Sequence, residues 1–365
     1  MDDRAPLVAR GSVTAPAGLN GEQSVVDFTD VAVLVPCHNE AQTIAQVVED
    51  FRIHLPGARV VVCDNDSSDG TAEAARAAGA LVITERRRGK GYAVRRLFSD
   101  VDANFFVMVD GDGTYDAARA QEMVRLMRDE GVDTVLGVRR SRTESGAAEF
   151  RAGHQLGNLA FSRIFSLLFD TRYSDALTGY RGFSRRFVKS CPLLARGFDV
   201  EIELNAHGAA LGMPLAEVTT LYTERPTGSA SKLNTYRDGA RILRRLMRLF
   251  RDFRPSLSFG GLGTVLGLLG VIAGVPVVLE YERTGLVPRF PTLFVVVALF
   301  LAALFLLLVG TILERASRDR LERNRLAYLA QPAPWQTAGP VPVGTALASP
   351  GIRLADAALG HRPAD

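Results

Sequence analysis

Cysteine and histidine are scarce in this sequence, and neither is spaced to bind a metal. The three cysteines are widely separated and form no CxxC pair, which argues against a disulfide framework and favours a reducing compartment. The five histidines have no metal-ligand spacing, so a zinc site is not expected. The net charge of +3 is too small to indicate a nucleic-acid partner, and none is expected.

Two glycine-rich phosphate-binding motifs are missing as well. The P-loop pattern GxxxxGK[ST] does not occur, and Pro36–Glu40 rather than GxGxxG follows the first apolar run. The second absence argues against a dinucleotide-dependent dehydrogenase. Residues 1–28 contain no apolar run long enough for a signal peptide, and we expect them to form a disordered tail.

Apolar runs of strand length alternate with helical patterns from Val31 to Val138. This alternation predicts an α/β fold over residues 29–235, with a mostly parallel sheet and helices on both faces. Ligands bind at the carboxyl ends of the strands in such sheets, so the segments after the strands are candidate site residues. These segments are Pro36–Glu40, Asp64–Gly70, Glu85–Gly91 and Asp110–Asp116.

Two long uncharged stretches occupy the C-terminal third. Pro255–Leu279 and Phe290–Leu313 each exceed the ~20 apolar residues needed to cross a bilayer, which predicts transmembrane helices over 255–281 and 290–313. Arginines cluster before the first and after the second. By the positive-inside rule, the folded domain and both termini are then cytoplasmic. The Arg- and Ala-rich composition favours a bacterial inner membrane.

The segments around these stretches carry further predictions. Residues 236–254 place apolar side chains at helical spacing among arginines, which predicts an amphipathic helix in the headgroup layer, or alternatively a solvated helix packed on the domain. Glycines four residues apart, at 263 and 267 and at 270 and 274, could permit homo-oligomers through the membrane helices. Residues 314–365 are expected to form a basic and then disordered tail.

Asp110 and Asp112 directly follow the apolar run Phe105–Val109. A hard divalent cation that bridges a diphosphate needs oxygen ligands of this kind, so the pair predicts a metal site for Mg²⁺ or Mn²⁺. Lys90, between two glycines at the start of a helix, offers a cation to an anionic ligand. Asp64 is placed to accept a hydrogen bond from a base, whereas the residues just after it have the pattern of a turn and helix cap.

Five motifs occur along the chain in a characteristic order: Val35–Glu40, the Asp64 loop, Asp110–Asp112, Asp175–Arg181 and Arg225–Lys232. Together they resemble the family 2 glycosyltransferases, and specifically the dolichyl- or polyprenyl-phosphate hexose synthases. The resemblance extends from about Val31 to Leu313. It implies a GT-A-like, Rossmann-type fold, a UDP- or GDP-sugar donor, and an undecaprenyl, decaprenyl or dolichyl phosphate acceptor.

The resemblance also implies roles for individual residues. On the donor side, the nucleotide-sugar pocket is expected to include Pro36, Asn39, Glu40, Asp64 and Lys90. The residues expected to hold the metal and the donor diphosphate are Asp110 and Asp112. On the acceptor side, Arg139 would meet the phosphate of the lipid, and a neighbouring loop would supply Asp175 and Arg181. A segment that closes on phosphate groups would comprise Arg225, Ser231 and Lys232.

Two departures from the family pattern affect the expected site. Cys37-His38 stands where many relatives have Thr-Tyr or Ala-Tyr, so a stacking aromatic side chain is missing from that loop. Thr114 replaces a glutamine that some members offer to the metal, which leaves the third protein ligand open.

The expected reaction is a single displacement with inversion at the anomeric carbon. The acceptor phosphate is already an anion, so the reaction does not need a strong base. The metal would neutralise the leaving diphosphate, and Arg139, Arg181 and Lys232 would offset the repulsion around the acceptor. Asp175 would orient an arginine or the sugar hydroxyls; the alternative is that it acts as a base. The predicted catalytic residues are Asp112, Arg139, Asp175 and Arg181. A processive polysaccharide synthase is disfavoured because the only tryptophan, Trp335, lies outside a Gln-x-x-Arg-Trp motif. Transfer to a non-phosphorylated lipid and a non-catalytic membrane scaffold remain as alternatives.

Overall fold

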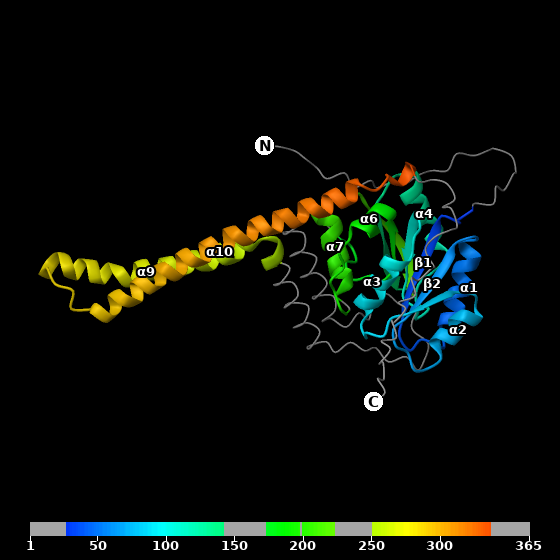
Figure 1. Ribbon diagram of the computed structural model, residues 1–365, viewed down its shortest axis with the longest axis horizontal. Helices are drawn as coiled ribbons and strands as arrows, with labels where there is room; N and C mark the ends of the chain where they lie inside the picture. Colours follow the sequence, from blue (N-terminus) through cyan, green and yellow to red (C-terminus); the bar gives the residue numbers. More distant parts are fainter. Residues whose placement is uncertain (1–26, 142–172, 198, 223–249, 337–365) are drawn as a thin grey trace, which may run out of the picture.

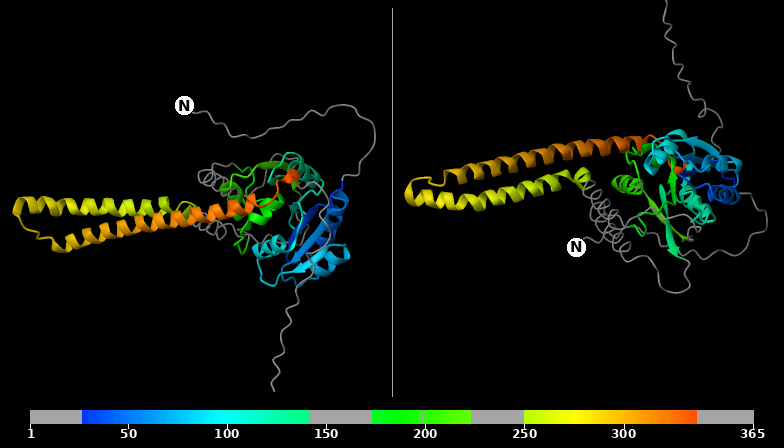
Figure 2. Two further views of the ribbon diagram at one scale, coloured as in Figure 1. Left: turned by 45° about the horizontal axis from the view of Figure 1, so that its top comes forward. Right: turned by 90° about the horizontal axis from the view of Figure 1, so that it is seen from below.

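The computed structural model describes residues 27–141, 173–197, 199–222 and 250–336, and it joins an α/β domain to a long helical hairpin (Figures 1 and 2). The strands are β1 (Val31–Cys37), β2 (Arg59–Asp64), β3 (Leu81–Thr84), β4 (Phe105–Met108), β5 (Thr134–Ser141), β6 (Arg181–Ser184) and β7 (Leu215–Tyr222). The helices of the domain are α1 (Ile44–His54), α2 (Thr71–Ala77), α3 (Lys90–Asp100), α4 (Arg119–Asp129), α6 (Arg185–Ser190) and α7 (Val200–Ala210). The hairpin consists of α9 (Pro255–Thr284) and α10 (Phe290–Leu329).

The seven strands form one sheet in the order β3-β2-β1-β4-β6-β5-β7. All neighbours pair in parallel except at β6, which is antiparallel to both β4 and β5. The prediction of a mostly parallel α/β sheet is therefore confirmed, with one reversed strand that it did not contain. This reversal places the start of β6 beside the end of β4, where Arg181 pairs with Met108.

Side chains from β1 alternate between two apolar cores, as the pleat of a strand requires. Val33 and Val35 join the core under α1, α2 and α4, whereas Ala32 and Leu34 join the core under α3, α6 and α7. Every residue of β1 is buried, which is typical of a parallel strand covered on both faces. The three cysteines are free thiols, two of them buried.

Lowering the pH from 7 to 5 is expected to reduce the free energy of unfolding by about 2 kcal/mol through His207 alone. This side chain lies in the second core with a 3.0 Å contact between its Nε2 and Ser190 Oγ, and burial lowers its pKa to about 4 from the usual 6.5. The unfolded chain binds this proton near pH 6.5 and the folded chain only near pH 4, so stability is lost as pH falls between them. Urea unfolding at both pH values tests this, with His54→Gln as the control. Equal pH slopes for His207→Gln and the wild type would contradict it.

The two helices of the hairpin contain the predicted apolar spans. With mean hydropathies of 2.4 and 3.2 in their most apolar windows, they are long and apolar enough to cross a membrane. Their seam is formed by small residues: a Cβ on Gly263 would lie 3.0 Å from the Ala303 carbonyl oxygen, and one on Gly270 would lie 3.4 Å from Phe300. These glycines pack α9 against α10 of the same chain. Self-association of the helices stays a prediction.

The basic segment after Leu313 is helical, which was not predicted. Helix α10 continues to Leu329, and a 3-10 turn, η1 (Pro334–Gln336), follows it. Residues 314–329 lack glycine and proline, and charged pairs one turn apart support the helix, including Arg315 with Asp319 (3.3 Å). At the other end of the chain, Phe28, which was predicted to lie in the N-terminal tail, is buried in the first core.

The end of α10 docks on the α/β domain, as both views in Figure 2 show. Tyr328 packs against the second core and its hydroxyl donates to Asp133 Oδ2 at 2.9 Å. The Arg186 guanidinium lies over the rings of Tyr328 (4.6 Å) and Trp335 (5.9 Å). Because Gly131 has φ of 68° and lies against the Trp335 ring, a side chain there would collide with the indole. The hairpin and the domain are thus joined at a packed contact.

Candidate active site

The carboxyl ends of β1, β2, β4 and β5 lie at one edge of the sheet, and most of the predicted site residues are at this edge. The reversed strand β6 brings the loop before it, Tyr173–Tyr180, to the same edge. Residues Arg225, Ser231 and Lys232 lie outside the described residues. So does all but the last part of the predicted amphipathic helix, 236–254.

Three predicted nucleotide-pocket residues lie on β1, β2 and the loops that follow them. Pro36 is buried near the end of β1. Asn39 has φ of 55°, a left-handed conformation that asparagine tolerates, and its Oδ1 accepts from the Ser68 N–H at 2.9 Å. Asp64 is 7% exposed, and its Oδ1 is buried without a hydrogen-bond partner among the described residues. An open, buried acceptor of this kind suits a donor group of a ligand.

The loops after β2 and β3 are tied together by Asn65, which was not among the predicted site residues. Its amide donates to the Glu85 carbonyl oxygen at 2.9 Å, and its Oδ1 accepts from the Gly89 N–H at 2.7 Å. Asn65 is 4% exposed, so these bonds are shielded from water. It thereby positions the loop that carries Lys90. The sequence signal that could have identified Asn65 is its amide side chain directly after Asp64, the carboxylate at the end of β2.

Three carboxyl groups converge on the turn after β4. A Cβ on Gly111 would lie 2.4 Å from Glu40 Oε2, so glycine is needed for this close approach. Burial, followed by the nearby charges of Asp110 and Asp112, raises the pKa of Glu40 to about 8. Its Oε2 is buried without a hydrogen-bond partner among the described residues. The buried site therefore disfavours a third negative charge beside Asp110 and Asp112.

Lys90 bridges Asp110 to a residue that was not predicted. Its Nζ lies 2.5 Å from Asp110 Oδ1 and 2.7 Å from Glu201 Oε1. Burial alone would lower the pKa of Lys90, but the two carboxylates raise it above its ordinary value, so the ammonium stays charged. Glu201 is 4% exposed on α7, four residues before the buried Asn205. The sequence signal that could have identified Glu201 is its spacing from Asn205, since residues four apart lie on the same face of a helix.

The residues present fit a divalent cation in charge and in ligand chemistry. Asp110 and Asp112 would supply two carboxylate ligands, and Glu40 beside them has a buried oxygen without a hydrogen-bond partner among the described residues. Asp112 Oδ1 also accepts from the Thr114 hydroxyl at 2.7 Å, so Thr114 orients the carboxylate. Among the described residues, no group of three or more His, Cys, Asp or Glu is arranged to enclose a metal. A substrate would have to complete the coordination.

Arg139 and Asp175 form a bidentate ion pair at the same edge of the sheet. Arg139 Nε lies 2.7 Å from Asp175 Oδ2, and Nη2 lies 2.8 Å from Oδ1. Arg139 also lies over the Tyr222 ring at 5.6 Å, and its side chain remains 25% exposed. Burial would lower the pKa of Arg139, but its bonds to Asp175 raise it above the usual value. The pair presents a fixed cation at the sheet edge.

Arg181 begins β6 beside the end of β4, but its side chain is buried in the interior and not open to a ligand. It is 1% exposed, and its guanidinium donates to the carbonyl oxygens of Thr178 and Ala176, both at 2.8 Å, and to Asn205 Oδ1 at 2.5 Å. Since these bonds engage its donors in the interior, Arg181 holds the loop that carries Asp175. Direct contact with an acceptor phosphate is not supported by this placement.

Comparison with known proteins agrees with the expected family. Residues 32–191 match the family described as glycosyl transferase family 2. Glycosyltransferase AglJ of Haloferax volcanii is 36% identical over 253 residues, covering 69% of this chain and 82% of that protein. The dolichyl-phosphate hexose transferase of the same organism is 32% identical over 230 residues, covering 63% of this chain and 98% of its own length.

A similar solved structure is that of glucosyl-3-phosphoglycerate synthase from Mycobacterium tuberculosis, in complex with Mn²⁺ and UDP-glucose. It has a TM-score of 0.48 and 22% sequence identity, and covers 60% of this chain and 77% of that chain. The match to AglJ over most of that protein's length, together with the family match across β1 to α6, identifies the chain: it belongs to glycosyltransferase family 2.

Proposed function

We propose that this chain transfers a hexose from a UDP- or GDP-sugar to polyprenyl phosphate at the cytoplasmic face of a membrane, using Mg²⁺ or Mn²⁺. One observation carries the proposal. The carboxylate cluster of Glu40, Asp110 and Asp112 lies at the ligand edge of a domain that is joined to two bilayer-length helices. The similarity to a dolichyl-phosphate hexose transferase supports the choice of acceptor.

On the donor side, Asp110 and Asp112 would hold the cation, which supplies charge neutralisation of the departing diphosphate. Lys90 keeps Asp110 in place through its 2.5 Å ion pair and is itself fixed by Glu201. The open oxygen of Asp64 would accept a hydrogen bond from the base of the nucleotide. The donor thus meets residues from β1, β2 and β4 at one edge.

On the acceptor side, the Arg139 guanidinium would bind the lipid phosphate, and Asp175 would orient it. An oxygen of that phosphate attacks the anomeric carbon, while the bond from this carbon to the diphosphate breaks. The phosphate is anionic near neutral pH, so no proton has to be removed before the attack. Because Asp175 is already paired at 2.7 and 2.8 Å, we assign it to positioning and not to proton transfer.

Helices α9 and α10 would anchor this edge beside the bilayer. Arginines flank both apolar stretches on the side of the domain, including Arg251, Arg254, Arg315 and Arg318, as expected for a cytoplasmic face. A membrane-embedded acceptor could then approach the sheet edge with its phosphate while its chain stays among lipids.

We expect the purified chain to convert polyprenyl phosphate and one nucleotide-sugar into an acid-labile sugar-phosphate lipid, and excess EDTA to abolish turnover until Mg²⁺ or Mn²⁺ is restored. A panel of UDP- and GDP-sugars, followed by mild acid hydrolysis of the lipid product, tests this. An acid-stable glycolipid would indicate a non-phosphorylated acceptor. No turnover with any donor would favour a scaffold, and full activity in EDTA would exclude the metal.

A further inference from the structure

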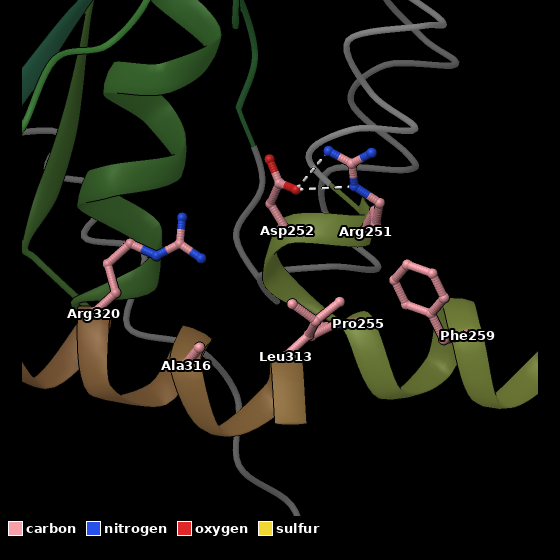
Figure 3. A pocket seen from close by; sticks show the side chains of 7 residues that line it. All are labelled: Arg251, Asp252, Pro255, Phe259, Leu313, Ala316 and Arg320. Atoms are coloured by element: carbon pink, nitrogen blue, oxygen red, sulfur yellow. Dashed lines mark hydrogen bonds and ion pairs between the residues drawn. The ribbon is translucent and has the colours of Figure 1, made fainter. Parts of the chain in front are cut away.

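A cavity of about 330 Å³ lies where α9 begins and α10 leaves its apolar stretch (Figure 3). Its apolar wall is formed by Pro255, Phe259 and Leu313. Its polar rim is formed by Arg251, Asp252 and Arg320. The volume is within the range of small-molecule sites, roughly 300–1,000 Å³. The lining residues are distant in sequence from the carboxylate cluster.

The rim carries one net positive charge. Arg251 Nη2 lies 3.2 Å from Asp252 Oδ1, so these two charges offset each other. Arg320 is exposed and makes no hydrogen bond or ion pair with any residue that the structure describes. Figure 3 shows the Arg320 guanidinium extended from α10 toward the side of the cavity where Asp252 and Arg251 lie. The cavity therefore offers a single uncompensated guanidinium above an apolar wall.

The cavity lies at the border between apolar and charged surface on the hairpin. On one side are exposed apolar side chains such as Leu257 (61%), Leu262 (52%) and Ile312 (67%). On the other side charged residues begin at Glu314, which accepts from the Ser256 hydroxyl at 3.0 Å. If the hairpin crosses a bilayer, as proposed above, this border coincides with the phosphate groups of the lipids.

We propose that the cavity binds the headgroup of an anionic glycerophospholipid, with its phosphodiester on Arg320 and its glycerol and acyl ends against Phe259 and Leu313. A phosphodiester carries one negative charge, which matches the net charge of the rim. A phosphomonoester such as the acceptor lipid carries up to two. Inorganic phosphate would gain nothing from the apolar wall. The site rests on the membrane location in the proposed function but not on the transfer reaction.

A lipid bound in this cavity would affect how the domain is oriented relative to the hairpin. Ser317 Oγ donates to the Asp252 carbonyl oxygen at 2.9 Å, which links α10 to the short helical segment 250–253 before α9. The neighbouring Phe253 packs against the third core cluster of the domain, which includes Leu136 and Ile202. A headgroup in the cavity would therefore touch both helices at the point where they meet the domain.

The test uses the full chain in neutral detergent, titrated with dioleoyl phosphatidylglycerol or dioleoyl phosphatidylcholine and examined by native mass spectrometry. We expect one retained phosphatidylglycerol per chain, preferred over phosphatidylcholine by about fivefold or more, as expected for one arginine at an anionic headgroup. Arg320→Gln should remove this preference. The matched control is Arg315→Gln, on the same helix, 79% exposed and paired with Asp319, which should keep it.

Several outcomes would overturn the site. They are equal retention of both lipids, equal loss in the two variants, displacement of phosphatidylglycerol by inorganic phosphate, and displacement by an equal concentration of polyprenyl phosphate. Sugar transfer in neutral detergent should be unchanged in both variants, which checks that they fold. If phosphatidylglycerol is retained but polyprenyl phosphate is never glycosylated, the lipid site stands and the proposed function fails.

Discussion

Replacing Asp112 with asparagine is expected to reduce sugar transfer at least about 100-fold, with little change in the stability of the fold. The asparagine Oδ1 can still accept the hydrogen bond from Thr114, which is 2.7 Å long in the wild type. The negative charge is lost, and with it, under the proposed function, a ligand of the cation that would neutralise the departing diphosphate. The measurement is kcat/KM for the nucleotide-sugar at saturating polyprenyl phosphate, together with the thermal unfolding midpoint.

The matched control is Asp116→Asn, four residues further along the same loop. Asp116 Oδ1 accepts from the Ala118 N–H at 3.0 Å, a bond that asparagine can also make, and Asp116 is outside the carboxylate cluster. We expect its activity to stay within about twofold of the wild type, as for a surface substitution. An Asp112→Asn variant that keeps half of the wild-type activity would refute the assignment of this carboxylate to the cation.

Replacing Asp133 with alanine is expected to lower the free energy of unfolding by about 3–5 kcal/mol. Asp133 is fully buried, and its carboxylate accepts from Arg186 Nε (2.5 Å) and Nη2 (2.7 Å), from Ser184 Oγ (2.6 Å) and from the Tyr328 hydroxyl. Without the carboxylate, the largely buried Arg186 guanidinium loses its counter-charge. Urea unfolding of the domain, followed by circular dichroism in neutral detergent, measures the loss.

Tyr328→Phe separates the docking of α10 from the buried ion pair. It removes one neutral donor to Asp133 and keeps the ring under Arg186, so we expect a cost of about 1 kcal/mol. A loss of equal size in both variants would mean that the hydroxyl of Tyr328, and not the ion pair, dominates the contact. Neither residue is at the ligand edge, so the KM for the nucleotide-sugar should not change.

The parallel part of the sheet could be predicted because its signals are local. The buried run in β1 and the polar segment after it are both visible in a few consecutive residues, and parallel strands necessarily bring their carboxyl ends to one edge. Asp110 and Asp112 also stand out locally, by their spacing and their position after β4, but their role as a cation ligand pair stays a prediction. The α/β class and the family followed from these signals.

The parts that could not be predicted depend on contacts between distant segments. β6 is only four residues long, and its reversed direction is set by pairing with both β4 and β5. Glu201 matters only because α7 places it against Lys90, 111 positions earlier in the chain. The guanidinium of Arg181 is a group that commonly binds phosphate, but it donates hydrogen bonds in the interior to Asn205 and to two loop carbonyl oxygens. The helical continuation from Leu313 to Leu329 was not predicted, because charge density alone does not show whether a basic segment is helical.

The unbroken course of α10 has a mechanical consequence. A helix of 40 residues is about 60 Å long, and this one begins in an apolar stretch and ends at Tyr328 against the core of the folded domain. If the apolar stretch lies in a bilayer, its tilt responds to the thickness of the hydrocarbon layer. With no hinge between the two ends, a change in tilt swings the sheet edge nearer to or farther from the lipid surface. Membrane thickness would then set how far a lipid phosphate must rise to meet Arg139.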